Sequence, residues 1–222
     1  MIELDEIIVH VDDSIIIVNK PSGLRTIPDG YDKNLLNLQS LLKIRFPTLL
    51  TVHRLDKETS GLIIFALNNG IHKNLNSQFE QRKIKKCYLA ITHNVPEWDV
   101  YSAMFPLIID GDRKHRTIIN ITGKNSQTEF KKVEINQEKN LSLVKAYPKT
   151  GYTHQIRAHL SYLGFPILGD YLYSHGLSPI QKAITKKSER LMLHASSITF
   201  IHPESNKKIT FNAKIPFNFE EI

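Results

Sequence analysis

Short apolar blocks separated by a polar turn characterise the first part of the chain. Residues 7–11 and 15–19 are rich in isoleucine and valine, and the polar residues 12–14 separate them. β-Branched side chains favour strands, and short Asp/Ser clusters favour turns. This pattern predicts two strands joined by a turn, the second of which ends where Pro21-Ser22-Gly23 interrupts it.

Three other segments carry apolar residues at helical spacing. Leucines recur with that spacing over residues 34–46, and Pro47 follows them. In residues 71–84 the apolar residues are four positions apart, and residues 150–164 begin as a loop and continue with a helical pattern as far as Gly164. These patterns predict three helices.

The remaining apolar segments are short and bounded by polar turns, which is typical of strands. They predict strands at residues 62–67, 88–92, 116–121, 128–135, 141–147, 191–203 and 207–213. Together with the helices they predict an α+β fold class, with a mixed, mostly antiparallel β-sheet core and a few flanking helices. No repeat, low-complexity tract or linker divides the sequence, so we expect one domain over residues 1–222.

Charge is unevenly distributed along the chain. The 222 residues include 29 Lys and Arg against 22 Asp and Glu, which gives a formal net charge of +7. The first thirteen residues hold five of the acids and none of the bases, so the remainder is more strongly basic. Clustered lysine and arginine favour a polyanion partner, because binding to phosphates releases counterions. We therefore expect a nucleic acid partner; a basic surface without a specific partner is the alternative.

The composition excludes several classes of protein. A single cysteine excludes a disulfide framework and a multi-cysteine zinc site, and it fits a reducing compartment. The longest apolar runs are too short to cross a bilayer, and the acidic N-terminus is unlike a signal peptide. No glycine-rich phosphate-binding motif and no GxSxG motif is present, which argues against a nucleotide cofactor and serine hydrolase chemistry. We expect a cytoplasmic protein with no membrane partner.

Residues 52–61, VHRLDKETSG, form the densest cluster of reactive side chains. Arg54 and Asp56 flank Leu55, and a strongly apolar predicted strand follows. This pattern places the charged residues in a loop held by a rigid sheet, an arrangement that often displays catalytic groups. An ordinary charged turn that ends at Gly61 is the alternative.

A second cluster lies in residues 150–160, TGYTHQIRAHL. If Thr153 caps the predicted helix, Arg157 lies near its first turn; a solvated helix surface is the alternative for this arginine. His154 and His159 are five positions apart and do not share a helical face well, so their spacing argues against a metal site. For His154 we favour a hydrogen-bonding position at the helix start.

Residues 83–90, KIKKCYLA, bring three lysines next to Tyr88 at the start of a predicted strand. An aromatic ring beside basic side chains suits base stacking combined with phosphate contact. A core tyrosine behind a solvated basic turn fits the local pattern equally well.

Taken together, these segments resemble the motifs of the RluA-type pseudouridine synthases. HRLD is similar to the family signature, whose catalytic aspartate maps to Asp56. KKCYLA resembles the strand with the active-site tyrosine, here Tyr88, and THQIR resembles the motif whose arginine faces the aspartate, here Arg157. The strand ending in NKPSG and the closing segment 191–216 also resemble family motifs, and all blocks run in family order. The resemblance is to the short, single-domain branch, so no separate N-terminal RNA-binding module is expected.

This resemblance implies a pseudouridine synthase fold and an enzyme that isomerises specific uridines in structured RNA, in 23S rRNA, in a tRNA anticodon stem-loop or in both. It implies that Asp56 acts on the ribose of a flipped base, either as a nucleophile on C1′ or through a glycal route. Arg157 would keep this carboxylate charged, and Tyr88 would stack on the uracil. The residues expected to bind the substrate are Arg54, His53, Leu193, His154 and Gln155.

The same resemblance implies that no metal or cofactor is needed and that the protein is a monomer. One departure from the family pattern concerns Tyr152, which stands where a basic residue is usual. This departure puts one phosphate or loop contact in question, but it does not affect Arg157.

Three other functions compete with this hypothesis. A non-catalytic RNA-binding or ribosome-assembly protein would use the basic surplus and Tyr88, but it has no need of the HRLD and HQIR motifs. A DNA-binding regulator is weaker, because no helix-turn-helix or zinc finger is recognisable. A glycosidase would need a second carboxylate as its acid; Glu58 is nearby in sequence, but we expect it to face solvent.

Overall fold

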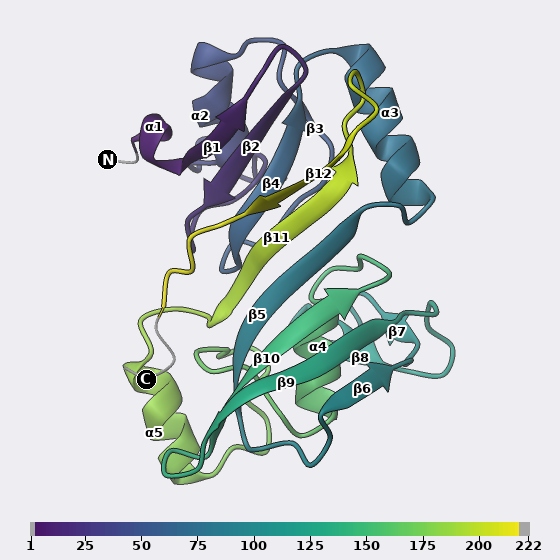
Figure 1. Ribbon diagram of the computed structural model, residues 1–222. Coiled ribbons are helices and arrows are strands. Elements are labelled where there is room, and N and C mark those ends of the chain that lie inside the picture. The colour runs from purple at the N-terminus through teal and green to yellow at the C-terminus, as the bar shows by residue number, and fades with distance from the viewer. Residues whose placement is uncertain (1–2, 218–222) are drawn as a thin grey trace. The chain divides into compact units, whose positions relative to one another are not determined.

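The computed structural model describes residues 3–217, which divide into two compact units (Figure 1). The first unit comprises the chain up to Lys86 together with Ala195–Ile215. Within the described residues, the second unit comprises Cys87–His194 and residues 216–217. The expectation of one domain over the whole chain stays a prediction.

The first unit is built on a mostly antiparallel sheet that is covered by helices. Its strands follow the order β1 (Ile8–Val11), β2 (Ile15–Lys20), β4 (Ser60–Ala66) and β11 (Leu193–Ile201). Strand β12 (Lys208–Asn212) pairs with β11, and the short β3 (Leu50–Thr51) pairs with β4. Its helices are α1 (Leu4–Ile7), α2 (Leu38–Arg45) and α3 (Asn69–Glu80). The chain crosses between the units within β5 (Lys85–His93) and within β11.

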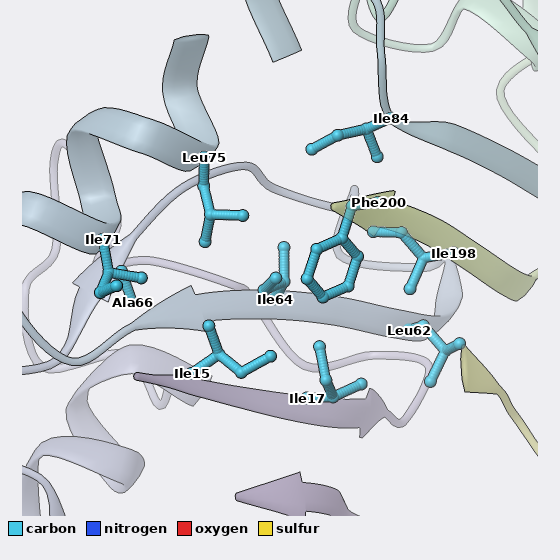
Figure 2. Packing of buried hydrophobic residues seen from close by; sticks show 10 residues of the cluster. All are labelled: Ile15, Ile17, Leu62, Ile64, Ala66, Ile71, Leu75, Ile84, Ile198 and Phe200. Atoms are coloured by element: carbon cyan, nitrogen blue, oxygen red, sulfur yellow. The ribbon is translucent and has the colours of Figure 1, made fainter. Parts of the chain in front are cut away.

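Strands β2 and β4 are buried on both faces, since successive side chains of a strand point to opposite sides. On one face they pack against Ile71 and Leu75 of α3, as Figure 2 shows. On the other face they pack against Leu38 and Leu42 of α2. The strand residues are Ile15, Ile17, Leu62, Ile64 and Ala66 on the α3 face, and Ile16, Val18, Ile63 and Phe65 on the α2 face. This double coverage explains why both strands read as unbroken apolar runs rather than alternating ones.

Side-chain caps make the two longer helices of the first unit differ from the ranges predicted by apolar spacing. The Asn37 side chain accepts a backbone N–H bond at 2.9 Å, so α2 begins directly after it rather than at residue 34. Asn68 caps α3 in the same way at 3.0 Å. At the other end, Arg82 adopts a left-handed φ of 56°, which turns the chain so that Ile84 enters the core outside the helix.

The second unit contains an antiparallel sheet in the order β5, β10 (Leu141–Pro148), β9 (Thr128–Asn136) and β6 (Val100–Ala103). Strands β7 (Leu107–Ile108) and β8 (Ile118–Ile119) pair separately, and the helices are α4 (Gln155–Tyr162) and α5 (Pro179–Lys187). The antiparallel pairings of both units confirm the predicted α+β fold class. None of the helices in the described part of the chain has the length and apolar character needed to cross a membrane.

Helix α5 is an element that the sequence analysis missed. Ser178 and Gln181 form a capping box, in which each side chain binds the backbone N–H of the other residue, at 3.2 and 3.0 Å. Pro179 occupies the first helical position, where its missing N–H is not needed. The signal was therefore the cap sequence rather than the apolar spacing.

Gly61, the second residue of β4, generates a test of the strand packing. Its φ is +113°, and a side chain at this position would overlap the backbone of Ala195 in β11. We expect Gly61→Ala to lower the free energy of unfolding by about 2 kcal/mol or more, because backbone strain adds to the overlap. Urea denaturation measures the change. In the control Gly70→Ala, the new methyl group meets only the Asn68 side chain at 3.4 Å, so stability is unchanged or higher. An equal loss in both variants would contradict this account.

Candidate active site

Lys20, the last residue of β2, is fully buried, and its ammonium group donates hydrogen bonds to three backbone carbonyl oxygens. The acceptors are Leu24 at 2.7 Å, Pro21 at 2.9 Å and Lys57 at 3.1 Å. The first two belong to the turn after β2, and the third belongs to the loop between β3 and β4. Because a buried cation needs such polar partners, Lys20 fixes this loop against that turn.

The turn after β2 makes two further bonds to the same loop. The backbone N–H of Gly23 donates to the Lys57 carbonyl at 2.9 Å, and the Ser22 hydroxyl donates to the Glu58 carbonyl at 2.6 Å. The NKPSG turn thus acts as a scaffold for the HRLD loop, a role that its motif did not reveal.

Thr26 holds the loop on the other side of Asp56. Its hydroxyl donates to the Leu55 carbonyl at 2.9 Å and accepts from the Leu55 N–H at 3.2 Å, and both residues are buried. Asp56 therefore lies between two fixed stretches of backbone, with Leu55 bound by Thr26 and Lys57 bound by Lys20. The loop is thus held on both sides of Asp56, and its catalytic role stays a prediction.

His53 supports the loop from the β4 side. Its Nε2 accepts a hydrogen bond from the Ile64 N–H at 3.1 Å, and its ring packs on Phe79 with centroids 4.8 Å apart. Burial lowers the pKa of His53 to about 3, and the nearby charge of Lys86 adds to this effect. Only a ring with an unprotonated Nε2 can accept the bond, so the folded protein holds His53 neutral.

The charged side chains of the loop differ in exposure. Arg54 is exposed, whereas Asp56 is partly buried. Glu58 is also exposed and pairs with Lys57 at 3.3 Å, so it faces solvent as expected. Asp56 is the carboxylate that this scaffold places.

In the second unit, Arg157 is buried, so a solvated helix surface is not its setting. Its Nε and Nη2 donate to the two carboxylate oxygens of Asp170 at 2.7 and 2.8 Å. Asp170 also accepts from the N–H groups of Leu172 and Tyr173, and the guanidinium carbon lies 5.1 Å from the centroid of the Tyr173 ring. This bidentate pair fixes the plane of the guanidinium.

The helix that carries Arg157 begins differently from the prediction. His154, not Thr153, is the N-cap residue of α4, and its φ of 55° is left-handed. His154 does stand at the helix start, but its Nδ1 lies 3.3 Å from the Tyr173 hydroxyl rather than bonding the helix. A left-handed backbone at a non-glycine residue costs about 1–3 kcal/mol, and such strain tends to be concentrated at functional sites.

Gln155 is buried and uses its whole amide within the second unit. Its Nε2 donates to the Gln127 carbonyl at 3.0 Å and to the Thr128 hydroxyl at 2.9 Å. Its Oε1 accepts from the Thr150 hydroxyl at 2.8 Å and the Tyr152 N–H at 3.1 Å. All four hydrogen-bonding positions are thereby occupied, so Gln155 ties the loop before α4 to the start of β9.

Tyr88 and Leu193 are both buried, at positions in β5 and β11 respectively. Tyr152, the departure from the family pattern, packs in an apolar cluster with Leu107 and Tyr173. The aromatic side chain at this position therefore contributes to packing against the β7–β8 segment.

The candidate residues form two groups, one in each unit. The first unit holds His53, Arg54 and Asp56, and the second holds Tyr88, His154, Gln155, Arg157 and Leu193. The predicted ion pair between Asp56 and Arg157 joins the two groups and stays a prediction. Lys20, Thr26 and Asp170 were missed, because nothing in their local spacing names the loop or helix that they bind. Within residues 3–217, no set of three or more His, Cys, Asp or Glu side chains could hold a metal ion.

Residues 14–162 match the family model described as RNA pseudouridylate synthase. The chain belongs to this family. It is 37% identical over 211 residues to the dual-specificity RNA pseudouridine synthase RluA of Haemophilus influenzae, covering 95% of this chain and 93% of the relative. The RluA protein of Escherichia coli K12 is also 37% identical, over 212 residues, covering 95% of this chain and 94% of the relative. The predicted enzyme class, pseudouridine synthase, is confirmed.

The structure of human RNA pseudouridylate synthase domain containing 1 matches the fold. Its TM-score is 0.79 at 28% identity, covering 95% of this chain and 84% of that one. Human RNA pseudouridylate synthase domain containing 4 gives a TM-score of 0.77 at 25% identity, covering 96% and 90%. The pseudouridine synthase fold is thus confirmed as well.

The buried ammonium of Lys20 gives a prediction for this pseudouridine synthase. In Lys20→Met three carbonyls lose their donor, so we expect the free energy of unfolding to fall by about 2–4 kcal/mol. We also expect kcat to fall on the order of 100-fold with little change in KM, because the loop with Asp56 shifts. Thermal unfolding and steady-state kinetics measure both effects. The control Lys57→Met removes an exposed lysine and leaves both quantities near wild type. A variant that loses stability but keeps its kcat would show that Lys20 does not position the loop.

The neutral state of His53 predicts a pH dependence of stability. The unfolded chain protonates this histidine below about pH 6.5, whereas the folded protein does so only near pH 3. The unfolded state therefore binds more protons in this window, and the free energy of unfolding falls as the pH drops through it. In His53→Gln, whose amide oxygen can accept the same bond, the fall between about pH 7 and pH 5 becomes shallower by up to ~1.4 kcal/mol per pH unit.

Urea denaturation at both pH values measures this difference in slope. The buried His93, His159 and His194, whose pKa values burial lowers to about 4, contribute equally in wild type and variant. Identical slopes in the two proteins would show that His53 is not held neutral.

Proposed function

We propose that this pseudouridine synthase isomerises specific uridines in more than one structured RNA, namely a tRNA anticodon stem-loop and 23S rRNA. The relatives from Haemophilus influenzae and Escherichia coli are named dual-specificity RNA pseudouridine synthases, and the chain covers most of their length. The observation that carries the proposed role of Asp56 in the reaction is the fixed backbone on both sides of it, which presents one carboxylate from a held loop.

The proposed reaction breaks the bond between ribose C1′ and uracil N1, turns the base and joins C5 to C1′. The proton on C5 is lost and N1 gains one, so the net change is an isomerisation. An ionised Asp56 serves this chemistry as a nucleophile on C1′ or through a glycal route, and both routes suit a centre with oxocarbenium character. Neither route as proposed uses a metal or a cofactor.

Arg157 is the proposed partner of the Asp56 carboxylate. Asp170 occupies its Nε and Nη2, so the guanidinium is already oriented and Nη1 is the nitrogen that Asp170 does not use. An oppositely charged neighbour favours the ionised form of a carboxylate. Because Asp170 already fixes the Arg157 side chain, Arg157 would favour the ionised form of Asp56 without losing further side-chain entropy.

The target base must leave its stack to reach Asp56. Arg54, exposed beside Asp56, is proposed to occupy the space that the base vacates. Tyr88 is proposed to stack on the uracil and assist proton removal from C5, and Leu193 to line the uracil pocket. Contact of His53, His154 and Gln155 with the substrate is the weaker part of this set, because their hydrogen bonds lie within the protein.

The central test compares Asp56→Asn with wild type on tRNA and 23S rRNA transcripts. We expect wild type to form pseudouridine at defined positions of both RNAs and the variant to be slower by roughly 1,000-fold or more. Pseudouridine mapping by sequencing measures both. Glu58→Gln, which neutralises the exposed neighbouring carboxylate, should keep wild-type activity and serves as the control.

A fluorouracil-substituted transcript separates catalysis from binding alone. A stable adduct that forms with wild type but not with Asp56→Asn supports the catalytic role. Tight binding by both proteins, with no pseudouridine formed by either, would instead support a non-catalytic RNA-binding protein. Conversion at equal rates by wild type and Asp56→Asn would reject Asp56 as the catalytic residue.

A further inference from the structure

Residues 27–36 form a loop whose two ends lie side by side. Arg25 and Asn37 pair with each other at its base. Thr26, directly before the loop, is the residue whose hydroxyl makes both bonds to Leu55. The loop is therefore anchored to the residue that precedes the proposed catalytic aspartate, within the first unit.

Hydrogen bonds from side chains order this loop internally. The Nε of Arg25 donates to Asp29 at 3.1 Å, and the other Asp29 oxygen accepts from the N–H groups of Tyr31 at 2.9 Å and Asp32 at 3.2 Å. These backbone bonds hold the pKa of Asp29 below its usual range. Within the loop Lys33 stands against Asp29 and Asp32, and Arg25 just before the loop brings the local charge to zero, so the loop has no net attraction for phosphate.

Tyr31 stands at the tip of this ordered loop, and its relative exposure is 104%. None of the hydrogen bonds and ring contacts described for residues 3–217 involves its ring. Leu36 in the same loop is 57% exposed. A single exposed apolar residue is common on a protein surface, but here a bare aromatic ring is carried by a loop that is fixed to the active-site segment.

We propose that Tyr31 stacks on a base of the substrate RNA close to the flipped uridine. Tyr31 is five residues from Thr26, so its backbone lies at most about 18 Å from that of Thr26, which is itself hydrogen-bonded to Leu55. This distance spans a few nucleotides. Unpaired RNA bases are commonly bound by stacking on aromatic side chains, and stacking needs no net charge. The inference rests on the proposed function, because it names a second contact for the same substrate.

A second copy of the chain is a poorer occupant of this loop. A stable interface buries about 800 Å² on each partner. The exposed apolar side chains here are Tyr31, Leu35 and Leu36, which are too few to supply that area.

The kinetic test uses a transcript that wild type has been shown to modify. In Tyr31→Ala we expect KM for this RNA to rise roughly 10-fold with kcat and Tm unchanged. The ratio to wild type should stay the same at low and high salt, because stacking releases no counterions. Tyr31→Phe keeps the ring and should keep the wild-type KM. Ile44→Ala, which removes an 81% exposed apolar side chain from α2, is the control and should also behave as wild type.

A spectroscopic test reads the contact directly. Trp98 is the single tryptophan of the chain, so Tyr31→Trp adds one reporter ring whose signal is obtained by difference. The measurement uses the double variant Tyr31→Trp/Asp56→Asn, which does not consume the RNA. We expect the fluorescence of the tryptophan at position 31 to be quenched when the RNA binds. Asp56→Asn alone gives the background from Trp98.

The outcomes separate this inference from the function on which it rests. If wild type modifies no RNA, the proposed function fails before Tyr31 is tested. If wild type is active but Tyr31→Ala has a wild-type KM, or the new tryptophan is not quenched, the stacking contact is rejected. A loss that disappears at high salt, or a change in oligomeric state of Tyr31→Ala by light scattering, also rejects it.

Discussion

The candidate site depends on the hydrogen bonds that the buried ammonium group of Lys20 donates to three backbone carbonyls. Burying a charge is costly unless polar groups replace the lost water. Here the replacements are carbonyls from two different loops, the turn after β2 and the loop that carries Asp56. The charge is accommodated only when both loops are in place. The packing at the end of β2 and the placement of Asp56 are therefore coupled.

The register of the sheet brings the two coupled loops close to each other. Lys20 pairs with Gly61 across β2 and β4, so the end of one strand lies beside the start of the other. Helices cover both faces of these strands, which leaves the loops at the strand ends as the parts free to carry chemistry. Gly61, with its left-handed φ and its close approach to Ala195, lies in the same closely packed region at the start of β4.

Sequence patterns predicted most of the strands and helices α2, α3 and α4, because these depend on local spacing of apolar residues. The short elements α1, β3, β6 and β7 were not predicted. Helix α5 was missed because the sequence signals it by a capping box and not by a regular spacing of apolar residues. The site was predictable only in part: HRLD and HQIR named Asp56 and Arg157, but their supports lie in other segments. Asp170 is 13 residues from Arg157, and Thr26 is 29 from Leu55, distances at which no periodicity applies.

Lys20 and Arg157, the buried cations of the two groups of candidate residues, are held in chemically different ways, and this difference bears on the proposed mechanism. The carbonyls around Lys20 are neutral, so they solvate its charge without cancelling it. Asp170, in contrast, balances the charge of Arg157. A carboxylate brought to Arg157 would therefore share a cation that is already paired, and it would gain less than from an unshared one. In the proposed mechanism Arg157 therefore acts mainly by orienting the carboxylate, whereas Lys20 fixes the loop that carries it.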